Sequence, residues 1–412
     1  MSITPADRTA TATATAAPTP ALSRARRTWL ALVLGSLSAF GPLTIDMYLP
    51  AMPDMARELA TSASAVQLTL TVFVIGLAVG QVLVGPVSDA WGRRRPLLAG
   101  LALYAAGSLL CALAPDITWL LTGRVVQSLG AAAGVVLSRA IVRDLFDGVA
   151  MTRFFSTLML VNGVAPIVAP VIGGQLLVVA RWQAVFHVLT GLGVLLLVAV
   201  LLALPESLPA ERRNARPRDT LRSLGALIAD WSYLRHVLAA ALVFAAVFAY
   251  ISGSSFVLQD GYGLSAQQYS LVFGLNGVGT VLLGAGNGLV VGKLASERTL
   301  LLAGTAVTAV AALGALVGAL AGWPLPWLLV CLFLVVAMMG VVLANATSLA
   351  LAGHGSAAGA ASSLQGLLQF LVAGIAASAM SWGGQATAVS MGATMVACSV
   401  GALALLVVRR SA

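Results

Sequence analysis

Long runs of apolar residues, separated by short polar connections, recur along the whole chain. A helix needs about 20 mostly apolar residues to cross a hydrocarbon core about 30 Å thick, and these runs have that length. We place twelve of them at residues 29–51, 66–86, 96–114, 118–141, 155–179, 184–204, 236–258, 268–291, 299–321, 325–349, 359–381 and 386–408. The pattern therefore predicts an all-α polytopic membrane protein with twelve transmembrane helices.

One polar segment divides the predicted helices into two sets of six. It follows the sixth helix and is rich in Arg, Glu, Asp and Pro. The first 23 residues are mostly Ala, Thr and Pro, a composition that cannot bury a core. We therefore expect a disordered cytoplasmic tail at 1–28, a six-helix half at 29–204, a cytoplasmic central loop at 205–235 and a second six-helix half at 236–412.

Composition agrees with a membrane protein, and the charge pattern adds its orientation. With 59% hydrophobic and 9% charged residues, the chain has too little polar surface for a soluble globule of this size. The basic residues that give a net charge of +9 gather at the two chain ends, in the central loop and in alternate connections, whereas the other connections hold only Arg57 and Arg181. By the positive-inside rule, both termini are cytoplasmic in a bacterial inner membrane. The charge therefore indicates topology and not a nucleic-acid partner.

Two ionisable residues lie inside the apolar segments, Asp46 in the first and Arg124 in the fourth. Because a charge at the bilayer centre costs roughly 2.5 to 3.5 kcal/mol on insertion scales, such residues are candidates for function. At 1.5 Å per residue, both are expected roughly 8 to 9 Å below the same membrane boundary. An Arg beside the carboxyl favours its ionised form, so movement of Arg124 away from Asp46 would favour protonation. The alternative is a permanent structural ion pair.

Polar side chains within other segments are candidates for a substrate cavity. Gln127 and Ser128 follow Arg124 at helical spacing and are expected on the same face. Ligand cavities are mostly apolar with a few placed polar groups. The predicted cavity residues are Tyr48, Gln127, Ser128, Asn162, Tyr250, Asn276, Asn345, Gln365 and Gln369. For each one alone, an interhelical hydrogen bond is the stronger alternative.

The connection after the second segment combines small, acidic and basic residues. It contains Gly85, Asp89, Gly92, Arg93 and Arg94. Gly85 would let helices approach closely, and Asp89 would sit beside the positive amino-terminal end of the segment 359–381. This arrangement predicts a gate at the cytoplasmic end. The alternative is a solvated basic turn that only fixes topology.

The fifth segment is rich in small residues and proline. Gly163, Pro166, Pro170, Gly173 and Gly174 would provide close helix packing and a bend within the membrane. Small-residue patterns are common in membrane helices, so this pattern is informative mainly because it lies in the fifth segment.

These patterns resemble those of the major facilitator superfamily. The residues 85–97 resemble its signature loop, with departures at Val87 and Ala90, and Arg124 with Gln127 resembles its fourth-helix motif. The fifth segment resembles the antiporter motif of drug exporters, and residues 41–53 together with 143–144 resemble the Bcr/CflA group of drug and proton antiporters. The resemblance covers the first six helices. It implies two halves rocking about a central site, proton coupling through the Arg of the fourth segment, and export of phenicol- or bicyclomycin-like drugs.

The chain is therefore expected to be a proton-coupled antiporter exporting small amphipathic drugs by alternating access. No nucleophile elbow, phosphate-binding loop or metal-spaced His and Cys set is present in the sequence, so an enzyme is not expected. We expect no cofactor, protons as the coupling ion, a monomer in the bilayer, and no nucleic-acid partner. Two alternatives stay open: an exporter of an endogenous amino acid or sugar, and a membrane sensor without transport.

Overall fold

The computed structural model describes residues 24–213, 225–352, 358–380 and 387–408. Within these ranges, eleven helices are long and apolar enough to cross a membrane, and a bent pair at the start gives a twelfth span. The described part of the chain contains no β-strand longer than one isolated bridge. The prediction of an all-α, twelve-span membrane protein is confirmed. Residues 1–23 of the predicted tail and part of the central loop lie outside the described residues, whereas residues 24–28, predicted as tail, begin the first helix.

The helices alternate in direction along the chain, six spans in each set. The first set comprises α1 (Arg24–Ser38), α2 (Phe40–Asp46), η1 (Leu49–Ala51), α3 (Met52–Glu58), α4 (Ala63–Trp91), α5 (Arg94–Ala112), α6 (Ile117–Leu145), α7 (Gly148–Val179) and α8 (Gln183–Ala203), followed by the short η2 (Ala210–Arg212). The second comprises α10 (Trp231–Ser255), the π-helical η3 (Phe256–Gly261), α11 (Ala266–Val290), α12 (Glu297–Leu320), α13 (Leu325–Leu351), α14 (Ala358–Met380) and α15 (Ala388–Val407).

Local sequence fixes several helix ends. Ser62 and Asp116 accept hydrogen bonds from backbone N–H groups in the first turns of α4 and α6, which have no partner within the helix. Gly92 has a φ of 88°, a value that side chains with a Cβ rarely adopt, and so permits the reversal from α4 to α5.

Small residues bring the helices of the first half close together. A Cβ on Gly107 would lie 2.4 Å from the backbone N of Gln127, and one on Gly130 would lie 2.4 Å from the backbone N of Tyr104. Dispersion between closely packed backbones stabilises helix pairs in lipid, where burial of apolar surface adds little. The helix α6 therefore packs tightly against α5, which holds Arg124 in the interior.

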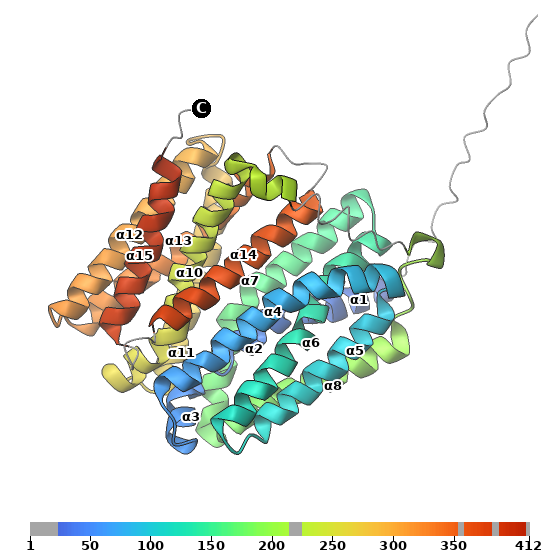
Figure 1. Cartoon of the computed structure of the whole chain (residues 1–412), viewed down its shortest axis with the longest axis horizontal. Helices are drawn as coiled ribbons and strands as arrows, with labels where there is room; N and C mark the ends of the chain where they lie inside the picture. The colour runs from blue at the N-terminus through green and yellow to red at the C-terminus, as the bar shows by residue number, and fades with distance from the viewer. Residues whose placement is uncertain (1–23, 214–224, 353–357, 381–386, 409–412) are drawn as a thin grey trace, which may run out of the picture.

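The two halves contact each other mainly through α4 with α14 and α7 with α11, as Figure 1 shows. We call the end of the bundle that carries α3 and η3 the Arg57 end, and the opposite end the Arg93 end. At the Arg57 end, the side chains of Ser255 and Gln259 donate hydrogen bonds to the carbonyls of Leu49 and Pro50 in the other half. The halves are therefore joined at this end.

At the Arg93 end, the helices lie farther apart around Gly85. A Cβ built on Gly85 would meet no other atom within 4 Å. The expectation that Gly85 mediates a close helix approach is wrong for this conformation, because the halves are in contact at the opposite end.

Candidate functional site

The regular α-helix of the first span is interrupted after Asp46. The helix α2 ends at this residue, and the chain continues through the 3-10 helix η1 into α3, whereas the 45° bend of the span lies earlier, between Ser38 and Phe40. Pro50 supplies no N–H to the carbonyl of Asp46, four residues earlier, so a regular helix cannot continue through this point. Interrupted membrane helices mark substrate and ion sites in secondary transporters. The break therefore places the acid at a candidate site.

Asp46 is buried at the end of α2, just before η1, which contacts α10 and α11 of the second half. Its exposed fraction is 4%, and in the described part of the chain its carboxylate has neither a hydrogen bond nor an ion pair. It lies within electrostatic range of the phenol groups of Tyr250 on α10 and Tyr269 on α11. The acid of the first half therefore faces the second half.

Arg124 is fully buried in an aromatic cage. Its guanidinium carbon lies 4.4 Å from the ring centres of both Tyr48 and Phe73, and 5.8 Å from that of Phe186. Aromatic faces attract cations most strongly where water is excluded. The cage thus stabilises the cation without a carboxylate.

Backbone and amide oxygens complete the surroundings of Arg124. Its Nε donates to the carbonyl of Thr69 at 3.3 Å, and its Nη1 donates to the carbonyl of Thr44 at 3.3 Å and to Gln127 Oε1 at 2.8 Å. Its Nη2 is buried without a hydrogen-bond partner. One donor of the guanidinium is therefore available to another acceptor.

The expectation that Asp46 and Arg124 lie at one membrane depth stays a prediction, because both helices have other bounds than the sequence indicated. The first span does not end near residue 51 but continues through α3 to Glu58, so Asp46 lies twelve residues before its end. Arg124 lies seven residues after the start of α6 at Ile117. No ion pair joins the two side chains, although Arg124 reaches the backbone of α2 at Thr44, two residues before Asp46.

The other polar residues predicted on α6 contribute to packing. Gln127 donates to Ser108 Oγ on α5 at 2.8 Å, and Ser128 donates to the carbonyl of Val125 in its own helix. Both side chains are fully buried. Their assignment to an open substrate wall is wrong for this conformation, because α4 and α5 cover them.

Three predicted cavity residues form hydrogen bonds within their own halves. Asn162 donates to Ser38 Oγ at 2.5 Å, and Asn345 donates to Asn287 Oδ1 at 2.7 Å. Gln365 donates to Thr347 Oγ1 at 2.6 Å. These contacts match the alternative of interhelical hydrogen bonds.

Tyr250 and Asn276 form a hydrogen-bonded pair in the second half. Asn276 Nδ2 donates to the hydroxyl of Tyr250 at 2.9 Å, and the hydroxyl of Tyr269 lies 3.1 Å from Ser254 Oγ. Of these four groups, the phenols of Tyr250 and Tyr269 lie within electrostatic range of Asp46. Tyr48, in contrast, belongs to the Arg124 cage, and its hydroxyl lies 3.2 Å from Thr69 Oγ1. Gln369 is half-buried on α14.

The small residues of α7 lie against the second half and the helix break. A Cβ on Gly173 would lie 1.9 Å from the carbonyl oxygen of Met47, and one on Gly174 would lie 2.3 Å from Ser270 Oγ on α11. Pro166 and Pro170 lie within the same helix, and Gly163 faces Val281 at an ordinary distance. The motif therefore packs where the halves meet at the Arg57 end.

The loop residues of the predicted gate form one charged cluster. Arg93 pairs with Asp89 at 2.5 Å and with Asp144 at 3.0 Å. Burial acts to lower the pKa of Arg93, but the hydrogen bonds and charges of Asp144 and Asp89 outweigh it and raise the pKa. The carboxylate of Asp89 is half exposed and, in the described residues, contacts Arg93 and not the amino-terminal end of α14.

Glu206 is a member of this cluster that sequence reasoning missed. Its carboxylate accepts hydrogen bonds from the backbone N–H groups of Arg93, Arg94 and Leu208. Partial burial acts to raise its pKa, but these hydrogen bonds hold the pKa below its usual range. A lone acid in a polar loop gives no sequence signal for such contacts.

The sequence also predicted none of the contacts that join the two halves at the Arg57 end. Gln67 donates to the carbonyl of Ser252, and Arg57 pairs with Asp260 at 3.3 Å, in addition to the bonds from Ser255 and Gln259. Pro50 and Pro53 were the available signal, because proline leaves carbonyls of a helix without their usual donors.

Comparisons with known proteins give the family. The family model described as Major Facilitator Superfamily matches residues 29–380. An "Uncharacterized MFS-type transporter YdgK" of Bacillus subtilis is 42% identical over 92% of this chain and 94% of its own length. A "Bicyclomycin resistance protein homolog" of Haemophilus influenzae is 33% identical over 90% of this chain and 93% of its own. "Multidrug resistance protein MdtL" of Escherichia coli is 29% identical over 57% of this chain and 59% of its own length.

Solved structures share the fold. The xylose transporter XylE from E. coli, described as partially occluded and inward open, superposes with a TM-score of 0.67 at 13% identity over 90% of this chain and 96% of its own. A peptide transporter, POT, in complex with alafosfalin superposes with a TM-score of 0.74 at 14% identity over 91% and 92%. The fold and the resemblance to bicyclomycin-resistance transporters are confirmed, and these relatives are transporters and not enzymes.

Proposed function

Because the chain belongs to the Major Facilitator Superfamily, we propose that it is a proton-coupled antiporter that exports small amphipathic drugs across a bacterial inner membrane. Relatives named for bicyclomycin and multidrug resistance support this substrate class. The observation that carries the coupling mechanism is Asp46, a buried carboxyl without a cationic partner at the end of α2, where the regular helix is interrupted.

Asp46 is the proposed proton carrier. A buried carboxyl with no counter-ion is more stable in the protonated form, whereas contact with a cation favours the carboxylate. The hydrogen bond from Arg124 Nη1 to the Thr44 carbonyl brings such a cation close to α2, and Nη2 of the same side chain has no hydrogen-bond partner. A shift of α2 that brings Asp46 to Nη2 would release the proton.

Substrate binding and protonation of Asp46 then favour opposite arrangements of α2. Substrate that binds between α2 and the Tyr250–Asn276 pair favours the arrangement in which Asp46 is ionised, and protonation favours substrate release. The Arg57 end faces outside and the Arg93 end faces the cytoplasm, where both termini lie and where basic residues gather. The closed Arg57 end corresponds to a state open toward the cytoplasm. The protein acts as a monomer.

A proton gradient can supply the required work. A charge that enters down the membrane potential yields about 2.3 kcal/mol per 100 mV, and each unit of pH difference adds about 1.4 kcal/mol. One proton therefore supports roughly a hundredfold gradient of a neutral compound.

The test measures protons released when chloramphenicol or bicyclomycin is added to detergent-solubilised protein with a pH indicator. The wild type should release protons in proportion to bound compound. Asp46→Asn should release none while it retains measurable binding, and Asp54→Asn, a change at an exposed acid, should behave like the wild type. Proton release by Asp46→Asn in proportion to binding would show that another group carries the proton.

Variants of Arg124 extend this test. Lysine keeps the charge but lacks the planar fork that contacts Thr69, Thr44 and Gln127, so Arg124→Lys should be impaired and Arg124→Ala inactive. If neither compound binds or changes resistance while a cell metabolite elicits proton release, the protein exports that metabolite by the same mechanism. If no compound elicits release, the transport proposal fails.

A further inference from the structure

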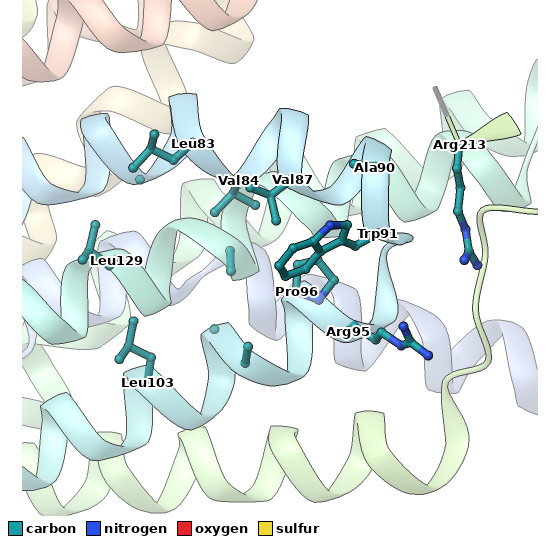
Figure 2. A pocket seen from close by; sticks show the side chains of 14 residues that line it. Leu83, Val84, Val87, Ala90, Trp91, Arg95, Pro96, Leu103, Leu129 and Arg213 are labelled. Atoms are coloured by element: carbon teal, nitrogen blue, oxygen red, sulfur yellow. The ribbon is translucent and has the colours of Figure 1, made fainter. Parts of the chain in front are cut away.

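A groove lies on the first half, away from Asp46. The helices α4 and α5 both pack along α6 but leave a space of about 940 Å³ between them, seen in Figure 2. Its volume is within the range of small-molecule sites, which is about 300 to 1,000 Å³. Its lining residues are Gly80, Leu83, Val84, Val87, Ala90, Trp91, Arg95, Pro96, Ala99, Gly100, Leu103, Leu129, Ala133 and Arg213.

Small residues explain why no side chain of the protein fills this groove. A Cβ on Gly80 would lie 2.6 Å from the Cβ of Ala132, and one on Gly100 would lie 2.3 Å from the Cβ of Ala133. Both outer helices therefore approach α6 closely, and the floor beneath the gap carries short side chains. The gap between α4 and α5 stays open.

The groove faces the hydrocarbon of the bilayer. Leu83, Val87 and Leu103 on its walls are exposed, as is Trp91 at its end, with an exposed fraction of 66%. In Figure 2, Trp91 lies next to Pro96 at the end where Arg95 is found. Tryptophan is enriched at the level of lipid headgroups. The groove therefore runs from the headgroup region toward the membrane centre.

The headgroup end of the groove is positively charged. Arg95 is exposed and has no hydrogen bond or ion pair in the described part of the chain. The nearby acids Asp89 and Asp144 are both paired with Arg93. Arg95 therefore keeps an uncompensated charge at the groove.

Arg213 adds a second cation to the same lining. Its Nε and Nη2 donate long hydrogen bonds to the carbonyl of Leu208, at 3.4 and 3.3 Å, and Nη2 lies 3.9 Å from Glu206 Oε2, a carboxylate that already accepts three backbone hydrogen bonds, so the charge of Arg213 is only partly compensated. Figure 2 shows its side chain at the end of the groove that Arg95 occupies.

We propose that this groove is a binding site for an anionic phospholipid of the leaflet at the Arg93 end. One acyl chain lies against Leu83, Val87 and Leu103, and the phosphate interacts with Arg95 and Arg213. Basic pockets between transmembrane helices on the cytoplasmic side suit anionic headgroups, and arginine side chains extend readily to that level. The site is separate from the transport pathway.

The test is native mass spectrometry of the full-length protein in detergent with phosphatidylglycerol or phosphatidylcholine of identical acyl chains. The wild type should retain one phosphatidylglycerol more tightly than phosphatidylcholine. The preference for phosphatidylglycerol over phosphatidylcholine should fall about fivefold in Arg95→Gln, and by about the same factor in Arg213→Gln. Ala99→Phe, which fills the groove, should weaken both lipids. Arg95 and Ala99 are exposed, so these variants should fold.

Matched controls separate this site from general lipid contact. Arg153→Gln removes an exposed cation at the same end, and Ala102→Phe adds an aromatic ring on an exposed face of α5 outside the groove. Neither should change retention. Equal retention of the two lipids, an Arg153→Gln effect equal to that of Arg95→Gln, or retention unchanged in Ala99→Phe would overturn the proposal. Displacement of the lipid by soluble glycerol phosphate would also overturn it, since that marks an anion site without an acyl chain.

A second measurement locates the acyl chain. Phosphatidylglycerol brominated near the headgroup end of its chains should quench the part of the fluorescence that Trp91→Phe removes. That quenching should be absent in Ala99→Phe. Quenching that persists in Ala99→Phe would place the chain outside the groove.

Discussion

Arg124 shows how a membrane helix tolerates a charge without an ion pair. Insertion of an arginine at the centre of a helix costs roughly 2.5 to 3.5 kcal/mol. A desolvated cation–π contact contributes about 2 kcal/mol, and a hydrogen bond to a charged group contributes about 1.5 to 3 kcal/mol. Two rings at 4.4 Å and three acceptors are therefore sufficient to offset the cost. Asp46 is not needed for this purpose, which leaves it available for protons.

Glu206 gives a prediction about stability and pH. Its folded pKa is below the usual range, so its contribution is fully present above the unfolded pKa, near 4.3, and is lost as pH falls through the folded value. Glu206→Gln should unfold at a lower temperature than the wild type at pH 7, and the difference should shrink below about pH 4. Thermal unfolding in detergent between pH 3 and pH 8 measures this. A difference that is constant over the range would contradict the proposed role of the carboxylate.

At the scale of helices, α7 controls how closely the halves approach. Gly173 lies against the carbonyl of Met47 in the broken span, and Gly174 lies against α11. Because the peptide groups at the break are held by the rest of α2 and η1, they cannot move away easily. Close packing at these two glycines therefore depends on the absence of side chains.

Gly173→Ala should destabilise the arrangement closed at the Arg57 end by about 1 to 3 kcal/mol, the usual cost of overpacking. We would measure it by cross-linking Arg57→Cys and Asp260→Cys with a short bifunctional maleimide, since all three native cysteines are buried. The cross-linking rate should fall in Gly173→Ala. It should stay unchanged in Gly191→Ala, where an added Cβ meets no atom within 4 Å. Equal rates in both variants would remove the packing argument.

At the scale of the whole molecule, the contacts between the halves differ at the two ends of the bundle. The Arg57 end is joined by hydrogen bonds between the halves, while Asp89 at the other end pairs only with its own half in the described residues. The exposed Arg57–Asp260 pair contributes at most about 1 kcal/mol, so the buried Ser255 contact and the partly buried Gln259 contact dominate the closure. Alternation requires these to break while new contacts form near Asp89.

Asp89→Asn should therefore slow transport about tenfold, because a charge-assisted contact worth about 1.5 to 3 kcal/mol is missing when the Arg93 end closes. Expression and substrate binding should be unchanged. Transport into inverted vesicles measures the rate, and Asp147→Asn is a matched control, since this exposed acid makes no capping hydrogen bond. Full transport by Asp89→Asn would exclude a gating role.

The proposed orientation can be tested separately. A membrane-impermeant maleimide should label Ala321→Cys, between α12 and α13, in intact cells, and should label Glu211→Cys only after permeabilisation. Labelling of Glu211→Cys from outside would reverse the assigned orientation.

The sequence alone determined the number of spans, the intramembrane acid and base, and the motifs of the first half. Hydropathy and the cost of an embedded charge depend on composition along a segment, so both can be read without a structure. In the sequence, only Pro50 indicated the interruption of the helix after Asp46, and the predicted end of the first span at residue 51 was too early because α3 continues to Glu58. The tertiary structure alone decided that Arg124 lies between Tyr48 and Phe73 and that Asp46 comes within electrostatic range of Tyr250. Those contacts join residues far apart in the chain, and they depend on how closely small residues let the helices pack.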